Sequence, residues 1–263
     1  MGNPTLMGTV SKALGLIELL RESGHPLGLS EIARLAGFDK ATARRLLLEL
    51  AANGYIEQDE DSRGYALGPA LQMLGRAREN SFPLNRAIQP AVRALAEQTG
   101  ETVHATEYCA GSLASIFAVE SGKANRVILE HGQKLPLHAT ASGYAFLAAS
   151  TEAFVESVCR REFEAFTPTT PTDSKALMDI VTATRERGYS ISNQSMEEGV
   201  SSVAAAIRGA GGKPVGTMAI AMPASRVTPD IIRGYGELVR KTSAQVSARL
   251  FGKSTAQPFR KAS

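Results

Sequence analysis

Residues 28–50 read GLSEIARLAGFDKATARRLLLEL, which predicts a short amphipathic helix, a glycine turn and a second helix with a basic beginning. In the first helix, Ser30 stands at the expected N-cap position and Gly37 at the C-cap position, where glycine readily adopts a left-handed backbone. Asp39 can cap the second helix. The apolar side of that helix consists of Leu46, Leu47 and Leu50. Two short helices around such a turn are typical of a helix-turn-helix.

The segments on either side of this pair extend the pattern to a winged form of the motif. A preceding helix has apolar residues at helical spacing, which predicts that they face the core. These residues are Val10, Ala13, Leu14, Ile17 and Leu20. After the pair, residues 55–58 and 64–67 alternate around the acidic turn 59–62, which predicts a β-hairpin. We therefore expect a winged helix-turn-helix domain over residues 9–68.

A basic cluster at the start of the second helix points to DNA as the partner of this domain. The second helix of such a motif presents its N-terminal turn to the major groove, while its apolar side packs on the first helix. The side chains expected at this leading end are Lys40, Ala41, Thr42, Arg44 and Arg45. Arg63, at the hairpin tip, can reach a phosphate or the minor groove. Because winged helices also dock proteins, protein binding is the alternative interpretation.

The rest of the chain predicts a helical linker and a larger domain of mixed secondary structure. We expect the linker helix over residues 69–82, an α+β domain over 83–251, and a flexible tail over 252–263. Within the larger domain, Pro90 predicts a kink or a late start of the first helix, at 84–99. Further helices are expected over 140–150, 151–160, 174–187 and 229–250. Strands are expected over 102–109, 113–120, 126–130, 189–193, 202–208 and 215–222.

Composition excludes several other classes of protein. The 263 residues are 43% hydrophobic and 21% charged, which is the balance of an ordinary globular chain and not of a disordered one. No apolar run approaches the roughly 18 residues of a membrane span, and the N-terminus lacks the pattern of a secretory signal. The two cysteines, Cys109 and Cys159, have no metal or redox spacing. We therefore expect a cytoplasmic protein.

Several motifs in their order along the chain resemble the IclR family of bacterial transcriptional regulators. In the first domain the resemblance lies in residues 28–50 and in Gly54-Tyr55, Tyr65-Ala66-Leu67-Gly68 and Leu71-Gln72-Met73-Leu74-Gly75. In the second domain it lies in LPLHATASGYAFLA at 135–148, in Arg187-Gly188-Tyr189-Ser190, and in Glu197-Glu198-Gly199-Val200. Ser202-Val203-Ala204-Ala205, Val215-Gly216, Pro223 and Arg226-Val227-Thr228 complete it. The resemblance covers nearly the whole chain.

The resemblance implies that the second domain is a GAF-like antiparallel sheet flanked by helices, with an effector pocket on one face. The pocket residues that it implies are Ala124, Val127, Leu135, Ala141, Ser142, Ser192, Val200, Ser202, Ala219 and Ala221. Family members that sense very small oxo-acids tend to carry an acid at the position of Ser192, cysteine at Ser202, and serine at Ala219 and Ala221. The alanines leave a more apolar wall, which favours an aromatic acid or a related amide.

We thus predict a ligand-responsive transcriptional regulator, a repressor or an activator, that binds a palindromic double-stranded operator as a homodimer and senses a small organic acid. Its effector domains could extend the dimer to a tetramer. Neither catalytic residues nor cofactors are expected, because no nucleophile elbow surrounds the serines. The four histidines, His25, His104, His131 and His138, are scattered along the sequence without metal-ligand spacing. The alternative is a small-molecule or metal sensor whose winged helix docks protein.

Overall fold

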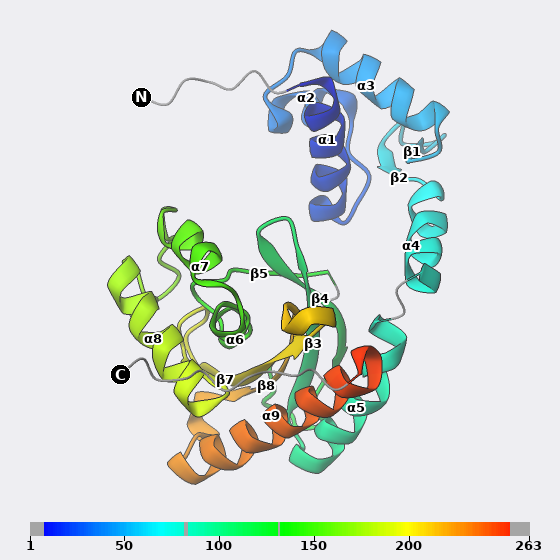
Figure 1. The fold of residues 1–263 in the computed structure, drawn as a ribbon. Helices are drawn as coiled ribbons and strands as arrows, with labels where there is room; N and C mark the ends of the chain where they lie inside the picture. The colour runs from blue at the N-terminus through cyan, green and yellow to red at the C-terminus, as the bar shows by residue number, and fades with distance from the viewer. Residues whose placement is uncertain (1–7, 82–83, 131, 253–263) are drawn as a thin grey trace. The chain divides into compact units, whose positions relative to one another are not determined.

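The computed structural model describes residues 8–81, 84–130 and 132–252, and the chain divides between residues 83 and 84 into two compact units. The N-terminal unit contains α1 (Thr9–Ser23), α2 (Leu29–Ala36), α3 (Lys40–Ala52), β1 (Ile56–Gln58), β2 (Tyr65–Leu67) and α4 (Ala70–Ser81) (Figure 1). The strands β1 and β2 pair as an antiparallel hairpin. This order of elements confirms the predicted winged helix-turn-helix.

Local capping explains where the two central helices begin and end. Gly37 ends α2 with a φ of 68°, and the Asp39 side chain accepts a hydrogen bond from the backbone N–H of Thr42 at the start of α3, as predicted. The predicted N-cap of α2 was wrong, because that helix begins at Leu29 and Ser30 lies inside its first turn. The reason is a bridge between Leu27 and Tyr65, which holds the chain extended immediately before the helix.

The core of the N-terminal unit includes Leu20 from the predicted side of α1, with Ala13 packed against it, but it also uses Leu16 and leaves two predicted residues at the surface. The buried residues are Leu16, Leu20, Leu27, Ile32, Leu46, Leu47, Ile56 and Tyr65. Val10 and Leu14, which were expected to face the core, are 72% and 57% exposed. The helix carries apolar residues on more than one side, so Leu16 and Leu20 can pack inward while Val10 and Leu14 remain at the surface.

The C-terminal unit is built on a six-stranded antiparallel sheet with the order β5-β4-β3-β8-β7-β6. The strands are β3 (Thr102–Cys109), β4 (Ser112–Val119), β5 (Lys134–Leu135), β6 (Ser190–Asn193), β7 (Val200–Arg208) and β8 (Pro214–Pro223). The helices are α5 (Leu84–Thr99), α6 (Ala141–Ala149), α7 (Glu152–Cys159), α8 (Ser174–Arg187) and α9 (Pro229–Phe251). Helices α5 and α9 cover one face, and α6 and α8 lie over the other (Figure 1). The α+β class is confirmed.

Three elements of this unit differ from the sequence prediction, and one of them, the two-residue strand β5, was not predicted at all. Helix α5 begins at Leu84 and continues through Pro90, because the buried side formed by Ile88, Val92 and Leu95 packs along its length. Residues 126–130 form no strand. Their backbone is held by side chains instead: the Thr102 hydroxyl donates to the Val127 carbonyl at 2.6 Å.

Small side chains line the sheet face under α6 and allow the helix to approach closely. Ala141 and Ala145 of α6 pack against Ala204 of β7 and Ala219 of β8. A side chain at Gly143 could not be accommodated, since its Cβ would lie 2.3 Å from the Leu137 carbonyl oxygen. The N-terminus of α6 is therefore fixed against the sheet and against the loop that precedes it.

The predicted tail at 252–263 falls outside the described residues except for its first position. Across the described ranges, no helix combines the length and the apolar character needed to span a membrane.

Candidate functional site

The first candidate site is the exposed side of α3. Lys40, Ala41, Arg44 and Arg45 are exposed there. The residues that turn inward are Ala43, Leu46 and Leu47. None of the three cations forms an ion pair with a described residue, so their charges face solvent. The structure thus brings together the residues predicted to face the major groove.

Thr42, another of the residues predicted to contact DNA, also helps to cap the start of α3. Its backbone N–H donates to Oδ1 of Asp39 at 2.8 Å, and its hydroxyl donates to Oδ2 at 2.7 Å. The hydrogen bond from the Thr42 backbone, followed by that from its side chain, lowers the pKa of Asp39. The carboxylate is thereby retained at the positive end of the helix, where it stabilises the first turn. The Thr42 hydroxyl is left as a hydrogen-bond acceptor only.

Arg63 lies in the hairpin turn, as predicted, with a left-handed φ of 57°. Its carbonyl accepts a hydrogen bond from the Gln58 side chain at 2.9 Å, and its N–H donates to the Asp59 carbonyl at 3.0 Å. The side chain is exposed, but the same turn carries three exposed acids, Asp59, Glu60 and Asp61. Their negative charge opposes the approach of a phosphate, so Arg63 is a weaker candidate for DNA contact than the cations of α3.

The second candidate site is a cavity of about 70 Å³ at one end of the small-residue face of the sheet. The strand register explains how distant residues meet there: Ala221, Ser202 and Ser192 lie side by side on three neighbouring strands. The N-terminus of α6 and residues from the segments 127–129, 133–135 and 196–200 complete the walls. Eight of the predicted pocket residues line it, namely Val127, Leu135, Ala141, Ser142, Ser192, Val200, Ser202 and Ala221.

Two predicted pocket residues lie elsewhere. Ala124 is exposed in the loop after β4. Ala219 is buried in the cluster beneath α6, one step along β8 from Ala221. Because successive residues on one face of a strand are about 7 Å apart, this step moves the side chain from the cavity into the core.

Seven other described residues line this cavity, and the sequence analysis did not predict them. They are His104, Ile128, Leu129, Gln133, Thr140, Met196 and Glu197. His104 is the most informative, because it lies on β3 directly opposite Ala219 of β8. The pairing of these strands joins residues more than 100 positions apart, and no local pattern specifies it. Thr140 could have been found from its capping role, since its hydroxyl accepts from the Gly143 N–H at 2.9 Å.

His104 is a buried, neutral group in the cavity wall. Burial lowers its pKa to about 4, so the imidazole carries no charge near neutral pH. Its Nε2 lies 3.4 Å from the Ser142 hydroxyl, while Nδ1 has no hydrogen-bond partner in the described part of the chain. A buried polar atom without a partner is uncommon and can be satisfied by a bound molecule.

The remaining polar groups of the wall favour an anion of small size. The backbone N–H groups of Ala141 and Ser142 open α6, where the helix dipole attracts negative charge. The described part of the lining contains no lysine or arginine, and its one acid, Glu197, is exposed to solvent. Within residues 8–81, 84–130 and 132–252, no group of three histidine, cysteine, aspartate or glutamate side chains is placed to hold a metal ion.

Comparison with known proteins was consistent across both units. The family model for the bacterial transcriptional regulator IclR C-terminal domain matches residues 79–248, and that for the IclR helix-turn-helix domain matches residues 9–60. The Transcriptional repressor IclR of Escherichia coli (strain K12) is 30% identical over 242 residues, which cover 91% of this chain and 88% of that protein.

Solved structures of similar proteins share the fold. A putative IclR transcriptional regulator from Silicibacter sp. TM1040 has a TM-score of 0.87 at 37% identity and covers 97% of this chain and 100% of its own. The regulator from Alicyclobacillus acidocaldarius has a TM-score of 0.80 at 26% identity, covering 91% and 97%. An IclR homolog from Microbacterium hydrocarbonoxydans, complexed with 4-hydroxybenzoate, has a TM-score of 0.79 at 19% identity, covering 92% and 99%.

Proposed function

This chain belongs to the IclR family of transcriptional regulators, and from that premise we propose that it is a cytoplasmic repressor that binds a palindromic operator as a dimer and releases or retains it according to a small organic acid. The observation that carries the DNA-binding part is the row of exposed cations on α3, which form no ion pair with a described residue, while Leu46 and Leu47 of the same helix are buried. The relatives are regulators and not enzymes, which supports a role without catalysis.

Dimer formation is supported by apolar surface on the N-terminal unit. Helix α4 buries none of its residues, and Met73 and Leu74 on it are 71% and 52% exposed. Val10 and Leu14 of α1 add further exposed apolar surface. Large exposed apolar side chains grouped on short helices are typical of an interface, and a second copy of the chain is the partner expected here. A two-fold dimer reads two half-sites, which gives the operator its palindromic form.

The class of effector follows from the cavity between α6 and the sheet. A carboxylate placed at the N-terminus of α6 would meet the Ala141 and Ser142 N–H groups, and the Ser142 and Ser202 hydroxyls lie in the same wall. His104 would supply a neutral hydrogen-bonding atom. The cavity volume of about 70 Å³ suits an acid of a few heavy atoms. An aromatic acid or amide would require the wall residues 127–129 or 196–197 to move outward.

The operator part is tested by fluorescence anisotropy with the DNA upstream of the protein's own gene. Loss of one phosphate contact in each protomer should reduce the slope of log K against log salt by about 1.8 per dimer. Loss of a base contact should instead weaken operator binding by about 1–3 kcal/mol and relax sequence preference. We expect Arg44→Ala and Arg45→Ala to show one of these effects each, and Arg233→Ala on α9 to show neither. Wild-type binding by both variants would overturn the proposal.

The effector part is tested with a matched pair of substitutions on β8. Ala221→Leu places a larger side chain in the cavity and should abolish the response of operator binding to a small carboxylic acid or to 4-hydroxybenzoate, with the melting temperature preserved. Ala219→Leu overpacks the cluster beneath α6, so it should lower stability by about 1–3 kcal/mol. Calorimetry with the same acids measures binding directly. An unchanged response in Ala221→Leu would place the effector site elsewhere.

A further inference from the structure

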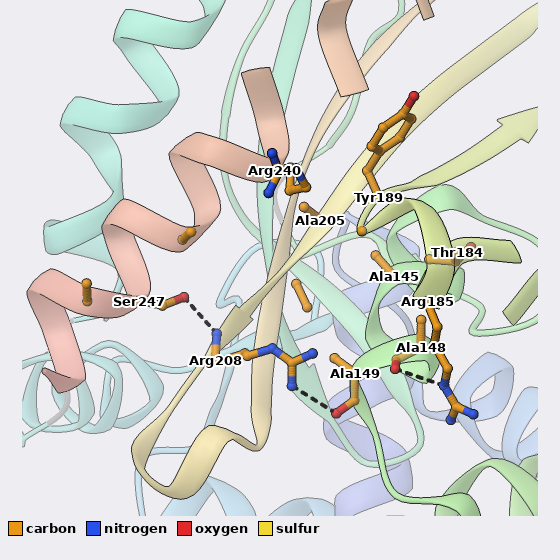
Figure 2. A pocket seen from close by; sticks show the side chains of 14 residues that line it. Ala145, Ala148, Ala149, Thr184, Arg185, Tyr189, Ala205, Arg208, Arg240 and Ser247 are labelled. Atoms are coloured by element: carbon orange, nitrogen blue, oxygen red, sulfur yellow. Dashed lines mark hydrogen bonds between the residues drawn. The ribbon is translucent and has the colours of Figure 1, made fainter. Parts of the chain in front are cut away.

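A second, larger cavity lies at the other end of α6. Strand β6 pairs with β7 from Ser201 to Ala204, so residues 205–208 of β7 extend beyond β6 as an edge of the sheet. A cavity of about 490 Å³ opens along this edge. Figure 2 shows it between α9 on one side of β7 and the C-terminal end of α6 on the other. This volume is within the range of roughly 300–1,000 Å³ that is typical of small-molecule sites.

The walls of this cavity are short and apolar. Seven alanines from three elements line it, which leaves room for the body of a ligand and offers it apolar surface. They are Ala145, Ala148 and Ala149 of α6, Ala205 and Ala206 of β7, and Ala244 and Ala248 of α9. This cavity is separate from the cavity of about 70 Å³ proposed above to bind the effector, called the effector cavity from here on. The effector cavity is lined by Ala141 and Ser142 at the opposite end of α6.

Among the residues that the structure describes, three guanidinium groups and no carboxylate line the cavity: Arg185, Arg208 and Arg240. Two of them have acidic partners outside it. Arg185 pairs with Glu152, and Arg240 pairs with Glu237 at 2.6 Å. The charge of Arg208 is left without such a partner among the described residues.

Arg208 is held in place by carbonyl oxygens instead. Its Nη1 donates to the Gly212 carbonyl at 2.9 Å and to the Ala149 carbonyl at 3.4 Å, the second of which is drawn in Figure 2. Burial lowers the pKa of this half-buried guanidinium. The Ala149 carbonyl belongs to the C-terminal end of α6, where the helix dipole amounts to about half a negative charge. That partial charge offsets only part of the unit charge on Arg208.

We infer that this cavity is a second ligand site that binds the carboxylate of a small aromatic acid, with Arg208 as its anion-recognition residue. A carboxylate matches the fork of a guanidinium group with two parallel hydrogen bonds and would supply the missing negative charge. The planar apolar body of an aromatic acid lies against the alanine walls. Ser247, whose hydroxyl accepts from the Arg208 N–H at 2.9 Å, fixes the backbone that carries the guanidinium.

The test uses the full-length protein and benzoate, titrated calorimetrically at low ionic strength. We expect at least a tenfold loss of affinity in Arg208→Gln, and the same loss in Ala244→Leu, which fills the cavity and leaves the charge in place. The control variant Arg249→Gln, which removes an exposed arginine of α9, should bind benzoate like the wild type. Benzamide, which has the same shape without the charge, should bind at least tenfold more weakly than benzoate.

Controls separate this site from the effector cavity and from a purely structural role of Arg208. Ala221→Leu should leave this benzoate site intact, whereas binding lost in Ala221→Leu and kept in Ala244→Leu would assign benzoate to the effector cavity and overturn the inference. Arg208 could also serve only to hold the end of α6. In that case Arg208→Gln would lower the melting temperature while Ala244→Leu would bind benzoate normally, which refutes the inference. Absence of millimolar benzoate binding in the wild type refutes it as well.

Discussion

Glu101 provides a sharp test of how the wall of the effector cavity is stabilised. Its carboxylate is 3% exposed and accepts from Arg226 Nε at 2.8 Å and Nη2 at 2.6 Å, and from Lys123 Nζ at 2.8 Å. Arg226 also donates through Nη1 to the Asn125 carbonyl at 2.9 Å. This network ties the loop before Val127 to the sheet. The substitution Glu101→Gln keeps the shape of the side chain and removes its charge.

The expected loss is about 3 kcal/mol of unfolding free energy, from the range of about 3–5 kcal/mol for removing one partner of a buried ion pair. The lower end applies because Arg226 and Lys123 are 26% and 48% exposed, so water can partly solvate them in the variant. Glu120→Gln is the matched control. Its ion pair with Arg126 has side chains 42% and 37% exposed, and such surface pairs contribute less than about 1 kcal/mol.

Urea unfolding followed by near-ultraviolet circular dichroism measures the difference. Four of the six tyrosines, Tyr108, Tyr144, Tyr189 and Tyr235, belong to the C-terminal unit, and the chain has no tryptophan. The signal therefore reports mainly on the unit that contains Glu101. Effector affinity should fall in Glu101→Gln, while operator affinity in the absence of effector should not. If Glu101→Gln destabilises the protein no more than Glu120→Gln, the buried network does not hold this loop.

Two further predictions concern protonation and assembly. The pKa of His104 is about 4 in the folded protein and 6.5 in the unfolded chain. The unfolded state therefore binds more protons between these values, and stability falls as the pH drops through that window. Between pH 7 and pH 4 the wild type should lose about 3 kcal/mol more unfolding free energy than His104→Gln, and parallel stability curves would contradict the burial of a neutral imidazole. The double substitution Met73→Ser and Leu74→Ser should weaken dimerisation at least tenfold in sedimentation equilibrium, because each apolar side chain buried in the interface contributes about 1.5–3 kcal/mol. The control Leu35→Ser on α2 should leave the dimer unchanged, and an unchanged dimer in the double variant would place the interface elsewhere.

The helix-turn-helix was predictable because its signals are local. Gly37 and Asp39 each determine a helix end through their own backbone or side chain, and they keep this role wherever the motif lies in the chain. The face of α1 was not predictable in the same way. Val10 and Leu14 satisfy a helical repeat, but a repeat shows only that residues share a side, and an apolar side can face the core or another protein.

The effector cavity was predictable only as far as a resemblance could carry single positions. Ala219 and Ala221 look equivalent in sequence, since both lie on the same face of one strand. The register of β8 with β3 and β7 separates them, placing Ala221 beside Ser202 at the cavity and Ala219 beside Ala204 under α6. His104 enters the cavity through the same register, and it has no sequence neighbour that signals this role.

Helix α6 connects the two cavities, and in the two proposals it favours acids in each by a different route. At its N-terminus the Ala141 and Ser142 N–H groups present the positive end of the dipole directly to a ligand. At its C-terminus the carbonyls of Ala148 and Ala149 attract Arg185 and Arg208, and these guanidinium groups reverse the sign that the helix end would otherwise present. An aromatic acid would occupy both cavities only if wall residues of the smaller one moved outward, and a titration of operator binding with that acid would then combine two effects. By linkage, each site changes DNA affinity only by its own preference between the DNA-competent and incompetent states. Ala221→Leu and Ala244→Leu, measured separately and together, assign the response to one site or divide it between them.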